Sequence, residues 1–391
     1  MKIIFNRQEI INTVSPLLCA VGSKSTIPTV ECLLIEAKMP DSITLTTYDL
    51  EKGVRCSAAG SVLEDGFYAI NANKFFQTLK VMEGEEVILT VNDKLETTIS
   101  SGKSSYKMQA FNGADFPAVP NIREDMSFEL PAALLKKTIS KISFAMGVND
   151  QRPVLNGAYF RITDGELLAV SCDSFKMAKC RCLTTLTNKN TDGSALRYSY
   201  IVPQKTVNEL FRMLPDGDDD VVTVYMSRKN MVYVFEGLTF FTRLIEGEYI
   251  DFDRIILKNH KINVTVERAR LLAALERAAI VTEEKIAGST RTPIKLSAEG
   301  DMLKLTAVSS VGSSYDEIEV EHTGEDILIA FNNRYLIDAV RACSSDKVKI
   351  ELSTPLYSIN IIPVEEETGE EDEKKVQNDD LFFLLPVRMK N

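Results

Sequence analysis

The chain has 391 residues, of which 45% are hydrophobic and 26% charged, and its formal net charge is −11. This composition is ordinary for a soluble globular protein. No apolar run reaches the roughly 18 residues that a membrane-spanning helix needs, and the N-terminus becomes polar too early for a signal peptide. The seven cysteines match no zinc-binding spacing, so we expect reduced thiols, a cytoplasmic location, and neither a metal nor a cofactor.

Amphipathic helix patterns alternate with β-strand patterns along the whole chain. The helices are expected at 8–21, 72–82, 131–146, 204–213, 267–280 and 332–342. The clearest strands are expected at 32–37, 42–47, 53–58, 158–162, 166–171, 294–298 and 302–308. Turn pairs such as Asp164-Gly165 and Glu299-Gly300 are typical of hairpins. The pattern predicts an α+β fold, with helices packed on one side of antiparallel sheet.

Two landmarks recur three times at a spacing of about one third of the chain. The first is an amphipathic helix and the second is a helix, a turn and a strand. They align at Ile11, Leu135 and Leu272, and at Val87, Val221 and Val348. A unit of about 130 residues is long enough to hold its own core, unlike a solenoid repeat. The sequence therefore predicts three tandem similar domains, at 1–124, 125–258 and 259–391.

Charge is unevenly distributed. The six expected helices hold twelve basic and five acidic residues, which sum to +7 and leave −18 on the rest of the chain. Lys205 and Arg212 are seven residues apart, which places both on one helix face. Such pairs often mark only a solvated surface, but their recurrence in an acidic chain favours local attraction of a polyanion.

Motifs for catalysis are missing from the sequence. There is no phosphate-binding glycine loop, no nucleophile elbow and no metal-spaced partner for His260 or His322. A binding or structural role is therefore favoured over an enzyme. Near the C-terminus, the acidic run 365–380 predicts an exposed loop, and the apolar run 381–388 predicts a final strand.

Several short motifs occur together in a characteristic order. They are Thr26-Ile27-Pro28, Asp49-Leu50-Glu51, Asp115-Phe116-Pro117, Leu155-Asn156-Gly157, Cys172–Ala178 and Leu385–Arg388. In this order the chain resembles the bacterial DNA sliding clamp family, the beta subunit of DNA polymerase III. The resemblance implies a DNA clamp fold in which two chains join head to tail. The resulting ring would have twelve helices around a hole that holds double-stranded DNA without reading its sequence.

The resemblance also implies DNA-contacting residues. By position these are Lys24, Asn73, Lys80, Asn149 and Arg152, and charge alone adds Lys74, Lys136, Lys137, Lys141, Lys205 and Arg212. Pro153 and Val154 replace aromatic residues that meet DNA in some relatives, so the resemblance does not extend to those two contacts.

A pocket for linear motifs of the polymerase catalytic subunit, the clamp loader and other partners is implied as well. Its residues would be Leu155, Cys172, Ser174, Phe175, Lys176, Met177, Ile250, Ile255, Leu384, Leu385, Pro386, Val387, Arg388 and Met389. Phe175 and Cys172 stand where histidine and threonine are frequent, so peptide preference could differ from that of relatives. The implied dimer contact places Lys103 and Tyr106 against Ile280, Val281, Glu317 and Glu319 of the partner chain.

Two other classes of function fit the sequence less well. One is an enzyme with an inter-domain cleft that uses an acid such as Asp173 or Asp316, which requires a perturbed carboxylate pair. The other is a tandem-domain scaffold that binds only proteins, whose helix cations would be spread over outward surfaces.

Overall fold

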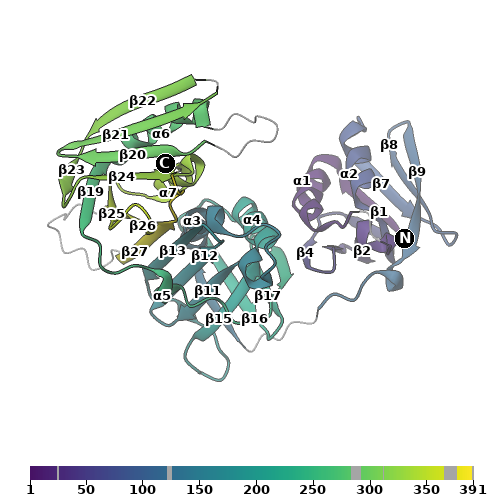
Figure 1. Cartoon of the computed structure of the whole chain (residues 1–391). Helices are drawn as coiled ribbons and strands as arrows, with labels where there is room; N and C mark the ends of the chain where they lie inside the picture. Colours follow the sequence, from purple (N-terminus) through teal and green to yellow (C-terminus); the bar gives the residue numbers. More distant parts are fainter. Residues whose placement is uncertain (24–25, 121–125, 283–291, 311, 365–376, 390–391) are drawn as a thin grey trace. The chain divides into compact units, whose positions relative to one another are not determined.

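The structure is a computed structural model, shown in Figure 1, and it describes residues 1–23, 26–120, 126–282, 292–310, 312–364 and 377–389. The chain separates into two compact units. The first unit comprises residues 1–134, 187–195 and 209–244, and the second comprises 135–186, 196–208 and 245–391. None of the described helices combines the length and apolar character needed to cross a membrane.

Within the described residues the elements form three runs of nine strands and two main helices. The first run is β1 (Lys2–Asn6), α1 (Arg7–Leu17), β2 (Cys32–Lys38), β3 (Ser42–Tyr48), β4 (Lys52–Ser57), β5 (Ser61–Glu64), β6 (Gly66–Asn71), α2 (Ala72–Val81), β7 (Glu86–Val91), β8 (Glu96–Ser101) and β9 (Ser104–Asn112). The second is β10 (Ser127–Pro131), α3 (Ala132–Ile142), β11 (Gly157–Thr163), β12 (Glu166–Cys172), β13 (Lys176–Leu183), β14 (Thr187–Asn188), β15 (Arg197–Pro203), α4 (Gln204–Met213), β16 (Val221–Met226), β17 (Asn230–Phe235) and β18 (Leu238–Arg243). The third is β19 (Ile262–Glu267), α6 (Arg268–Thr282), β20 (Ile294–Glu299), β21 (Met302–Ser309), β22 (Gly312–Glu319), β23 (Glu321–Thr323), β24 (Ile327–Phe331), α7 (Asn333–Ala342), β25 (Lys347–Leu352), β26 (Ile359–Val364) and β27 (Gln377–Leu384). A one-turn helix, α5 (Phe252–Ile255), precedes the third run.

Strand register confirms the threefold repeat and corrects its alignment. The first strand of each run pairs with its seventh, through Phe5↔Val87, Leu130↔Val222 and Val266↔Val348. The buried helix positions that correspond are therefore Ile10, Leu135 and Leu271, one residue away from the sequence alignment at Ile11 and Leu272. The expected position Val221 is likewise one residue off, because Val222 occupies the equivalent place.

Asparagine caps fix where several helices begin. Asn6 accepts hydrogen bonds from the backbone N–H of Gln8 and Glu9 at the start of α1. Asn71 and Asn332 cap α2 and α7 in the same way. Each cap satisfies N–H groups that the helix cannot pair internally, so the chain turns from strand to helix at a defined residue.

The first unit contains one continuous run of antiparallel strands, in the order β14-β10-β16-β17-β18-β4-β3-β2-β6-β9-β8-β7-β1-β5. Its central link, the first joint, pairs β4 of the first repeat with β18 of the second. Helices α1 and α2 pack together, as the purple ribbon of Figure 1 shows. Tyr48, Phe116 and Phe241 belong to an apolar cluster at this joint.

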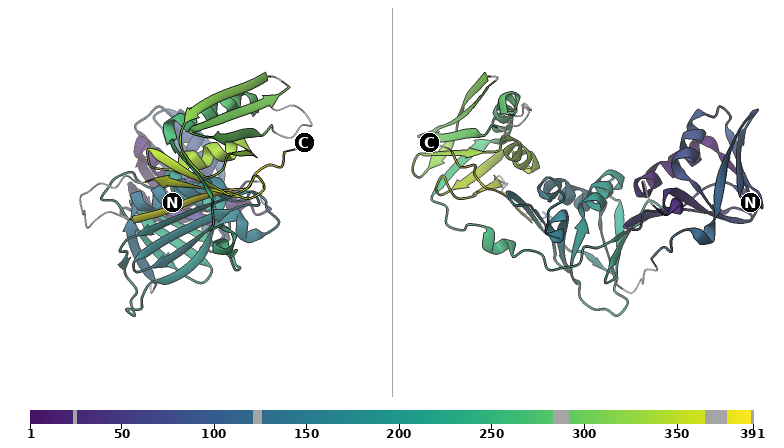
Figure 2. Two further views of the ribbon diagram at one scale, coloured as in Figure 1. Left: turned by 60° about the vertical axis from the view of Figure 1, so that its left-hand side comes forward. Right: turned by 45° about the vertical axis from the view of Figure 1, so that its right-hand side comes forward.

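The second unit holds a nine-stranded sheet, ordered β15-β11-β12-β13-β27-β26-β25-β19-β23, and a four-stranded sheet, ordered β22-β21-β20-β24. The second joint pairs β13 with β27. Helices α6 and α7 pack together, and both views of Figure 2 show them side by side.

The C-terminal part differs from the sequence prediction. Strand β27 starts at Gln377 and ends at Leu384, so the expected final strand 381–388 is displaced toward the N-terminus. The acidic run 365–380 is therefore not a loop to its end, because Asp380 lies in β27 and is buried. Residues 365–376 of that run lie outside the described residues. The hairpin turn at Asp164-Gly165 is confirmed, and the turn expected at Glu299-Gly300 lies one residue later, at Gly300-Asp301, because Glu299 still pairs with Met302.

Candidate functional surfaces

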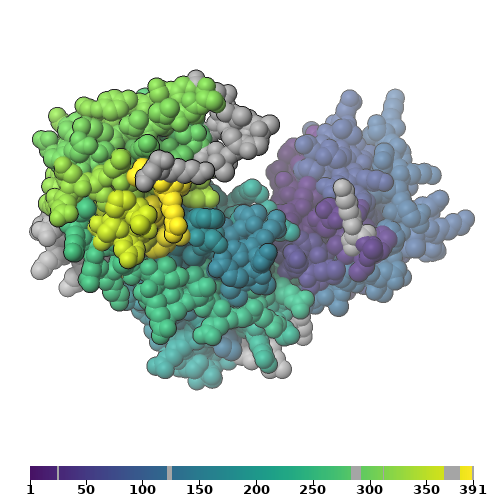
Figure 3. Space-filling model, in the orientation of Figure 1, coloured from purple at the N-terminus to yellow at the C-terminus, as the bar shows by residue number. Residues whose placement is uncertain are grey.

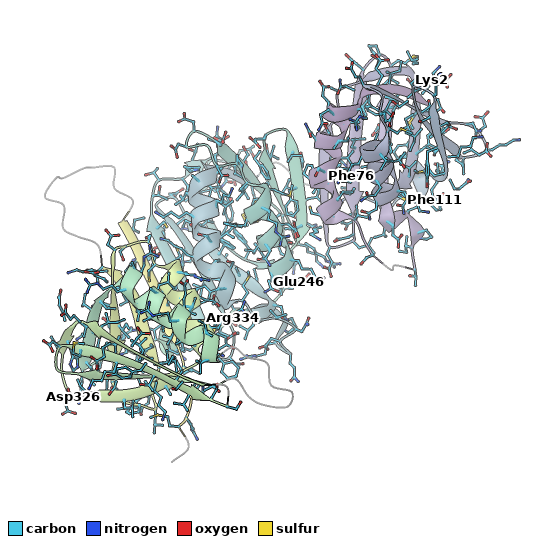
Figure 4. The ribbon with its side chains drawn as sticks, turned by 90° about the horizontal axis from the view of Figure 1, so that it is seen from above. Lys2, Phe76, Phe111, Glu246, Asp326 and Arg334 are labelled. Atoms are coloured by element: carbon cyan, nitrogen blue, oxygen red, sulfur yellow. The ribbon has the colours of Figure 1, made fainter. Side chains whose placement is uncertain are left out.

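Each main helix of the first two repeats except α1 carries at least one exposed lysine. Lys74 and Lys80 on α2, Lys137 on α3 and Lys205 on α4 are exposed, and Lys136 is half-buried. The Lys80 ammonium lies 5.4 Å from the centre of the Phe76 ring, and Phe76 is labelled in Figure 4. Lysine is a compact, mobile point charge, and such charges suit transient contacts with phosphate groups. Asn73 is also exposed, whereas Lys24 lies outside the described residues.

Several helix arginines form ion pairs with acidic side chains of the same chain. Arg277 donates to both carboxylate oxygens of Asp316, and the closest of these contacts is 2.6 Å. Arg341 reaches Glu276 at 2.6 Å, and Arg270 reaches Glu267 at 2.9 Å. Arg212, a predicted DNA contact, remains 69% exposed but pairs with Glu209. Sequence counting could not separate these paired cations from the exposed lysines.

Lys141 was expected on the DNA-facing surface, and that expectation is wrong. Its side chain is 4% exposed, and its ammonium lies 2.5 Å from the Asp380 carboxylate, which is fully buried. Burial by itself lowers the pKa of Lys141, but the hydrogen bond and charge of Asp380 outweigh it, so the pKa is raised. Lys141 is a charged member of the core of the second unit and is not available to phosphate groups.

A short loop after α3 carries the other predicted DNA contacts. Asn149 is exposed and has a φ of +55°, a conformation that asparagine tolerates. The Arg152 guanidinium donates two hydrogen bonds of 3.0 Å to the Asp150 carboxylate and a third, of 2.8 Å, to the Ser174 hydroxyl. The Arg152 hydrogen bonds lower the pKa of Asp150 to about 2. Pro153 is exposed, Val154 is half-buried and Val148 is 70% exposed, so the loop presents apolar side chains as well as Arg152.

Several residues of the predicted peptide pocket lie together at the second joint. Leu155, Cys172, Met177 and Phe383 are buried in one apolar cluster, and Ile250 packs against it. Burial and the nearby Asp173 charge raise the pKa of Cys172 to about 12, so its thiol is neutral at physiological pH. The structure therefore brings together residues that lie more than 200 positions apart in the sequence.

Exposed apolar side chains border this cluster. Phe175 is 56% exposed, Ile255 42%, Leu385 39% and Val387 38%. Leu384 is buried, Pro386 and Met389 are half-buried, and Arg388 is exposed. In Figure 3 the yellow C-terminal residues run along the surface of the second unit. A buried apolar floor with an exposed apolar border suits the anchoring of a short peptide.

Lys176 and Ser174 belong to the turn that shapes the border. Asp173 accepts hydrogen bonds from the backbone N–H of Phe175 and Lys176, and its other oxygen lies 2.9 Å from the Lys176 ammonium. That ammonium also lies 4.4 Å from the centre of the Tyr335 ring. The charge of Lys176 is therefore committed within the chain, and its part in the pocket is to hold the turn.

Sequence reasoning missed the aromatic residues of this surface. Tyr159 stacks on Tyr249 with ring centres 5.3 Å apart, and Phe252 lies 6.0 Å from Tyr159. Tyr335 lies 6.5 Å from Phe175. The strand expected at 158–162 includes Tyr159, but Tyr335 lies on a helix of another repeat. No local pattern in the sequence connects Tyr335 to the pocket.

The predicted dimer residues lie in or just before β9, on α6 and on β22. Lys103 and Glu317 are exposed, Tyr106 is 45% exposed and Ile280 is 79% exposed. Glu319 is also exposed, and Val281 is half-buried. These residues are therefore open to contact with another chain.

The two acids named for an enzyme are not poised for catalysis. Asp173 is held by Lys176, and Asp316 is held by Arg277. Among the described residues neither acid forms a carboxylate pair, which an enzyme of this kind requires. In the part of the chain that the structure describes, no group of histidine, cysteine or acidic residues is arranged to hold a metal ion.

Comparison with known proteins agrees with this architecture along the chain. Family models for the N-terminal, central and C-terminal domains of the DNA polymerase III beta subunit match residues 1–120, 129–251 and 253–375. The beta sliding clamp of Staphylococcus epidermidis is 26% identical over 400 residues, covering 99% of each chain, and that of Staphylococcus aureus is 27% identical over 368 residues, covering 90% of this chain and 92% of its own. Among solved structures, the DNA polymerase sliding clamp of Bacillus subtilis superposes with a TM-score of 0.89 at 23% identity, covering both chains fully. A DNA polymerase III beta subunit from Eubacterium rectale gives 0.88 at 26% identity, again covering both chains fully.

Three tandem clamp domains of mixed helices and antiparallel sheet define a DNA clamp fold. The chain belongs to the DNA polymerase III beta subunit family. Members of this family are sliding clamps, which are accessory subunits of the polymerase and carry no catalysis themselves.

Proposed function

We propose that two copies of this chain close head to tail into a ring that encircles duplex DNA and tethers DNA polymerase III for processive synthesis. The observation that carries the proposal is that each chain has two joints of one design and two strand edges of the same kinds that have no strand partner among the described residues. A clamp of this type works on the chromosome, so the proposed location is the cytoplasm.

The joints within the chain supply the template for the joint between chains. Each pairs the fourth strand of one repeat with the ninth strand of the next, β4 with β18 and β13 with β27. The fourth strand of the third repeat is β22, which is the edge of its sheet. The ninth strand of the first repeat is β9, and among the strands that the structure describes its residues 104–109 pair with β8 alone. One chain therefore offers each half of a third joint.

Transferring the register of the internal joints predicts the contact. In the second joint Phe382 lies opposite Ala178, and in the first Phe240 lies opposite Val54. The equivalent residue of β9 is Tyr106, which would then lie opposite the partner's Ser314. The same register sets Lys103 opposite the partner's Glu317. Opposite charges on directly facing residues stabilise an antiparallel strand pair.

Packing above the strands points to the same contact. Phe240 and Phe382 are fully buried, whereas Tyr106 is 45% exposed. Phe144, just after α3, lies 6.0 Å from Phe382. Counted from the helix start, Ile280 on α6 is the equivalent of Phe144. Docking of a partner would therefore cover Tyr106 with Ile280, removing two exposed apolar side chains from water.

Charge reversal tests this contact. We expect the unaltered chain to sediment as a dimer of about 87 kDa, twice the 43.6 kDa chain. Lys103→Glu and Glu317→Lys each place like charges opposite one another and should weaken the dimer. Combining both changes in one chain restores opposite charges and should restore the dimer. Failure of the double variant to regain affinity over the single variants would refute the proposed register.

DNA would be held by enclosure, with weak attraction from helix cations. The exposed lysines on α2, α3 and α4 support this, because mobile cations neutralise phosphates without fixing a register. The test is retention on DNA after loading. The ring should stay on nicked circles and slide off once they are linearised, and equal retention on both would refute topological binding.

The apolar surface at the second joint is the proposed docking site for the polymerase catalytic subunit, the clamp loader and other motif-bearing proteins. Deleting residues 385–391 removes part of its border, where Leu385 donates a backbone hydrogen bond to Phe175. Polymerase binding should be lost while the dimer persists. Loss of the dimer as well would show that the tail is a structural element and would count against the docking site.

A further inference from the structure

The two joints within the chain have the same turn and the same backbone hydrogen bonds. Asp49 accepts from the backbone N–H of Lys52 at 2.7 Å and holds the Lys52 ammonium at 2.8 Å. Asp173 and Lys176 repeat both contacts, each at 2.9 Å. The same turn therefore precedes β4 and β13.

Beyond the turn, the shared backbone hydrogen bonds continue into the partner strand. The backbone N–H of Arg243 donates to the carbonyl of Glu51 at 2.7 Å, and that of Leu385 donates to the carbonyl of Phe175 at 2.9 Å. Differences between the two joints must therefore come from side chains. The register makes Glu51 equivalent to Phe175, and Arg243 equivalent to Leu385.

In the first joint, two aromatic side chains fill the space beside Gly53. Phe241 faces Gly53, and Tyr48 faces Gly53 from the other side. A Cβ added to Gly53 would lie 2.1 Å from the tip of the Phe241 ring, so that ring occupies the space of a side chain at position 53. The Tyr48 ring lies 5.5 Å from the Phe241 ring, and both are buried.

The second joint has different residues at the positions equivalent to Tyr48 and Gly53. Phe383 faces Met177, and Cys172 faces Met177 across the hairpin. A small thiol thus stands in place of the Tyr48 ring, and an unbranched thioether stands in place of Gly53. Methionine adjusts its shape readily, which suits a surface that must accept an incoming apolar group.

The exposed residues beside the two joints also differ, and those of the second joint are more apolar. Phe175 and Leu385 are 56% and 39% exposed, and their equivalents Glu51 and Arg243 are exposed charged residues. One position differs the other way: Leu50 of the first joint is apolar and 40% exposed, whereas its equivalent in the second joint, Ser174, is polar. A single leucine beside two charges offers less continuous apolar surface than Phe175 and Leu385 do.

We propose that these differences in side chains close the first joint to ligands and leave the second joint able to bind an apolar peptide segment of the polymerase. The aromatic pair Tyr48 and Phe241 acts as a built-in plug, so the chain has one docking site although it has two joints of one design. This inference depends on the proposed docking function and names the residues that confine it to one joint.

The test converts the second joint into the likeness of the first. Cys172→Tyr with Met177→Gly installs the plug, with Phe383 free to move over position 177. The probe is the purified catalytic subunit of DNA polymerase III from the same organism, with binding measured by surface plasmon resonance. We expect affinity to fall at least tenfold, while the melting temperature and the oligomeric state show that the chain still folds.

A surface variant keeps the test decisive if the plug variant does not fold. Phe175→Glu with Leu385→Arg copies the charged border and should also weaken binding at least tenfold. The matched control is Glu51→Arg with Arg243→Glu at the first joint, which should bind as the unaltered chain does, with one polymerase per chain. Full affinity in either second-joint variant, or weaker binding in the control, would overturn the inference. No binding by the unaltered chain would instead overturn the docking function itself.

Discussion

Replacing Lys141 with methionine should destabilise the second unit strongly without affecting DNA attraction. The Lys141 and Asp380 side chains are 4% and 0% exposed, and their charged atoms lie 2.5 Å apart. Methionine keeps most of the length of the lysine side chain but removes its charge. The Asp380 carboxylate would then be buried beside Cys180, its partner across the strands, without a cation.

Removing one member of a buried ion pair costs about 3–5 kcal/mol, because the remaining charge loses its compensation. For a cooperative unit of about 150–250 residues, 1 kcal/mol shifts the melting temperature by about 2–4 °C. Lys141→Met should therefore lower the melting temperature of the second unit by about 6–20 °C. The double variant Lys141→Met with Asp380→Leu removes both charges and should recover most of this loss.

Calorimetry and urea unfolding on the two variants would measure these effects. Lys137→Met is the matched control, because Lys137 lies one helical turn away and is exposed. It should change stability by less than about 0.5 kcal/mol, as surface substitutions usually do. The reasoning would be refuted if Lys141→Met were as stable as the unaltered chain, or if the double variant were less stable than the single one.

Three further outcomes are expected. Lys137→Gln should reduce the slope of log Kd against log salt for DNA by about one for each of the two chains in the ring, because each chain loses one phosphate contact; an unchanged slope would exclude Lys137 from the DNA surface. Cys172 should resist alkylation of the native protein from pH 7 to 9, because a pKa raised to about 12 keeps the thiol protonated throughout that range, and peptide mapping after mild iodoacetamide treatment would detect any labelling. Arg277→Gln should cost no more than about 1 kcal/mol in urea unfolding, because the Arg277 side chain is 56% exposed and solvent screens its pair with Asp316.

Much of the fold could be predicted because its signals are local. Helix periodicity placed all six main helices, and α2, α4 and α7 have bounds within one residue of those expected. Helix α1 was expected to reach residue 21 but ends at Leu17, where a 3-10 turn continues the chain to Ala20. Apolar residues continue through that turn, so periodicity alone could not detect the change.

The burial of Lys141 could not be predicted, since its ion-pair partner Asp380 is 239 residues away. On α3, Lys137 and Lys141 are one turn apart and look alike in the sequence, yet one is exposed and the other buried. The buried position exists because β27 returns to pair with β13 and brings Asp380 under the helix. The same distant pairing makes Asp380 part of a strand although the acidic run before it predicted a loop.

Strand edges also determine how many chains can assemble. A chain that offers one free ninth-strand edge and one free fourth-strand edge makes a heterologous contact, which either closes into a ring or grows into a filament. Both edges use the backbone geometry of the internal joints, so each added chain repeats the same rotation. A ring uses every edge and stops growing, whereas a filament leaves one of each exposed and grows with concentration. A sedimentation profile with a single species across a hundredfold range of concentration would therefore identify closure, and a mass that rises with concentration would contradict it.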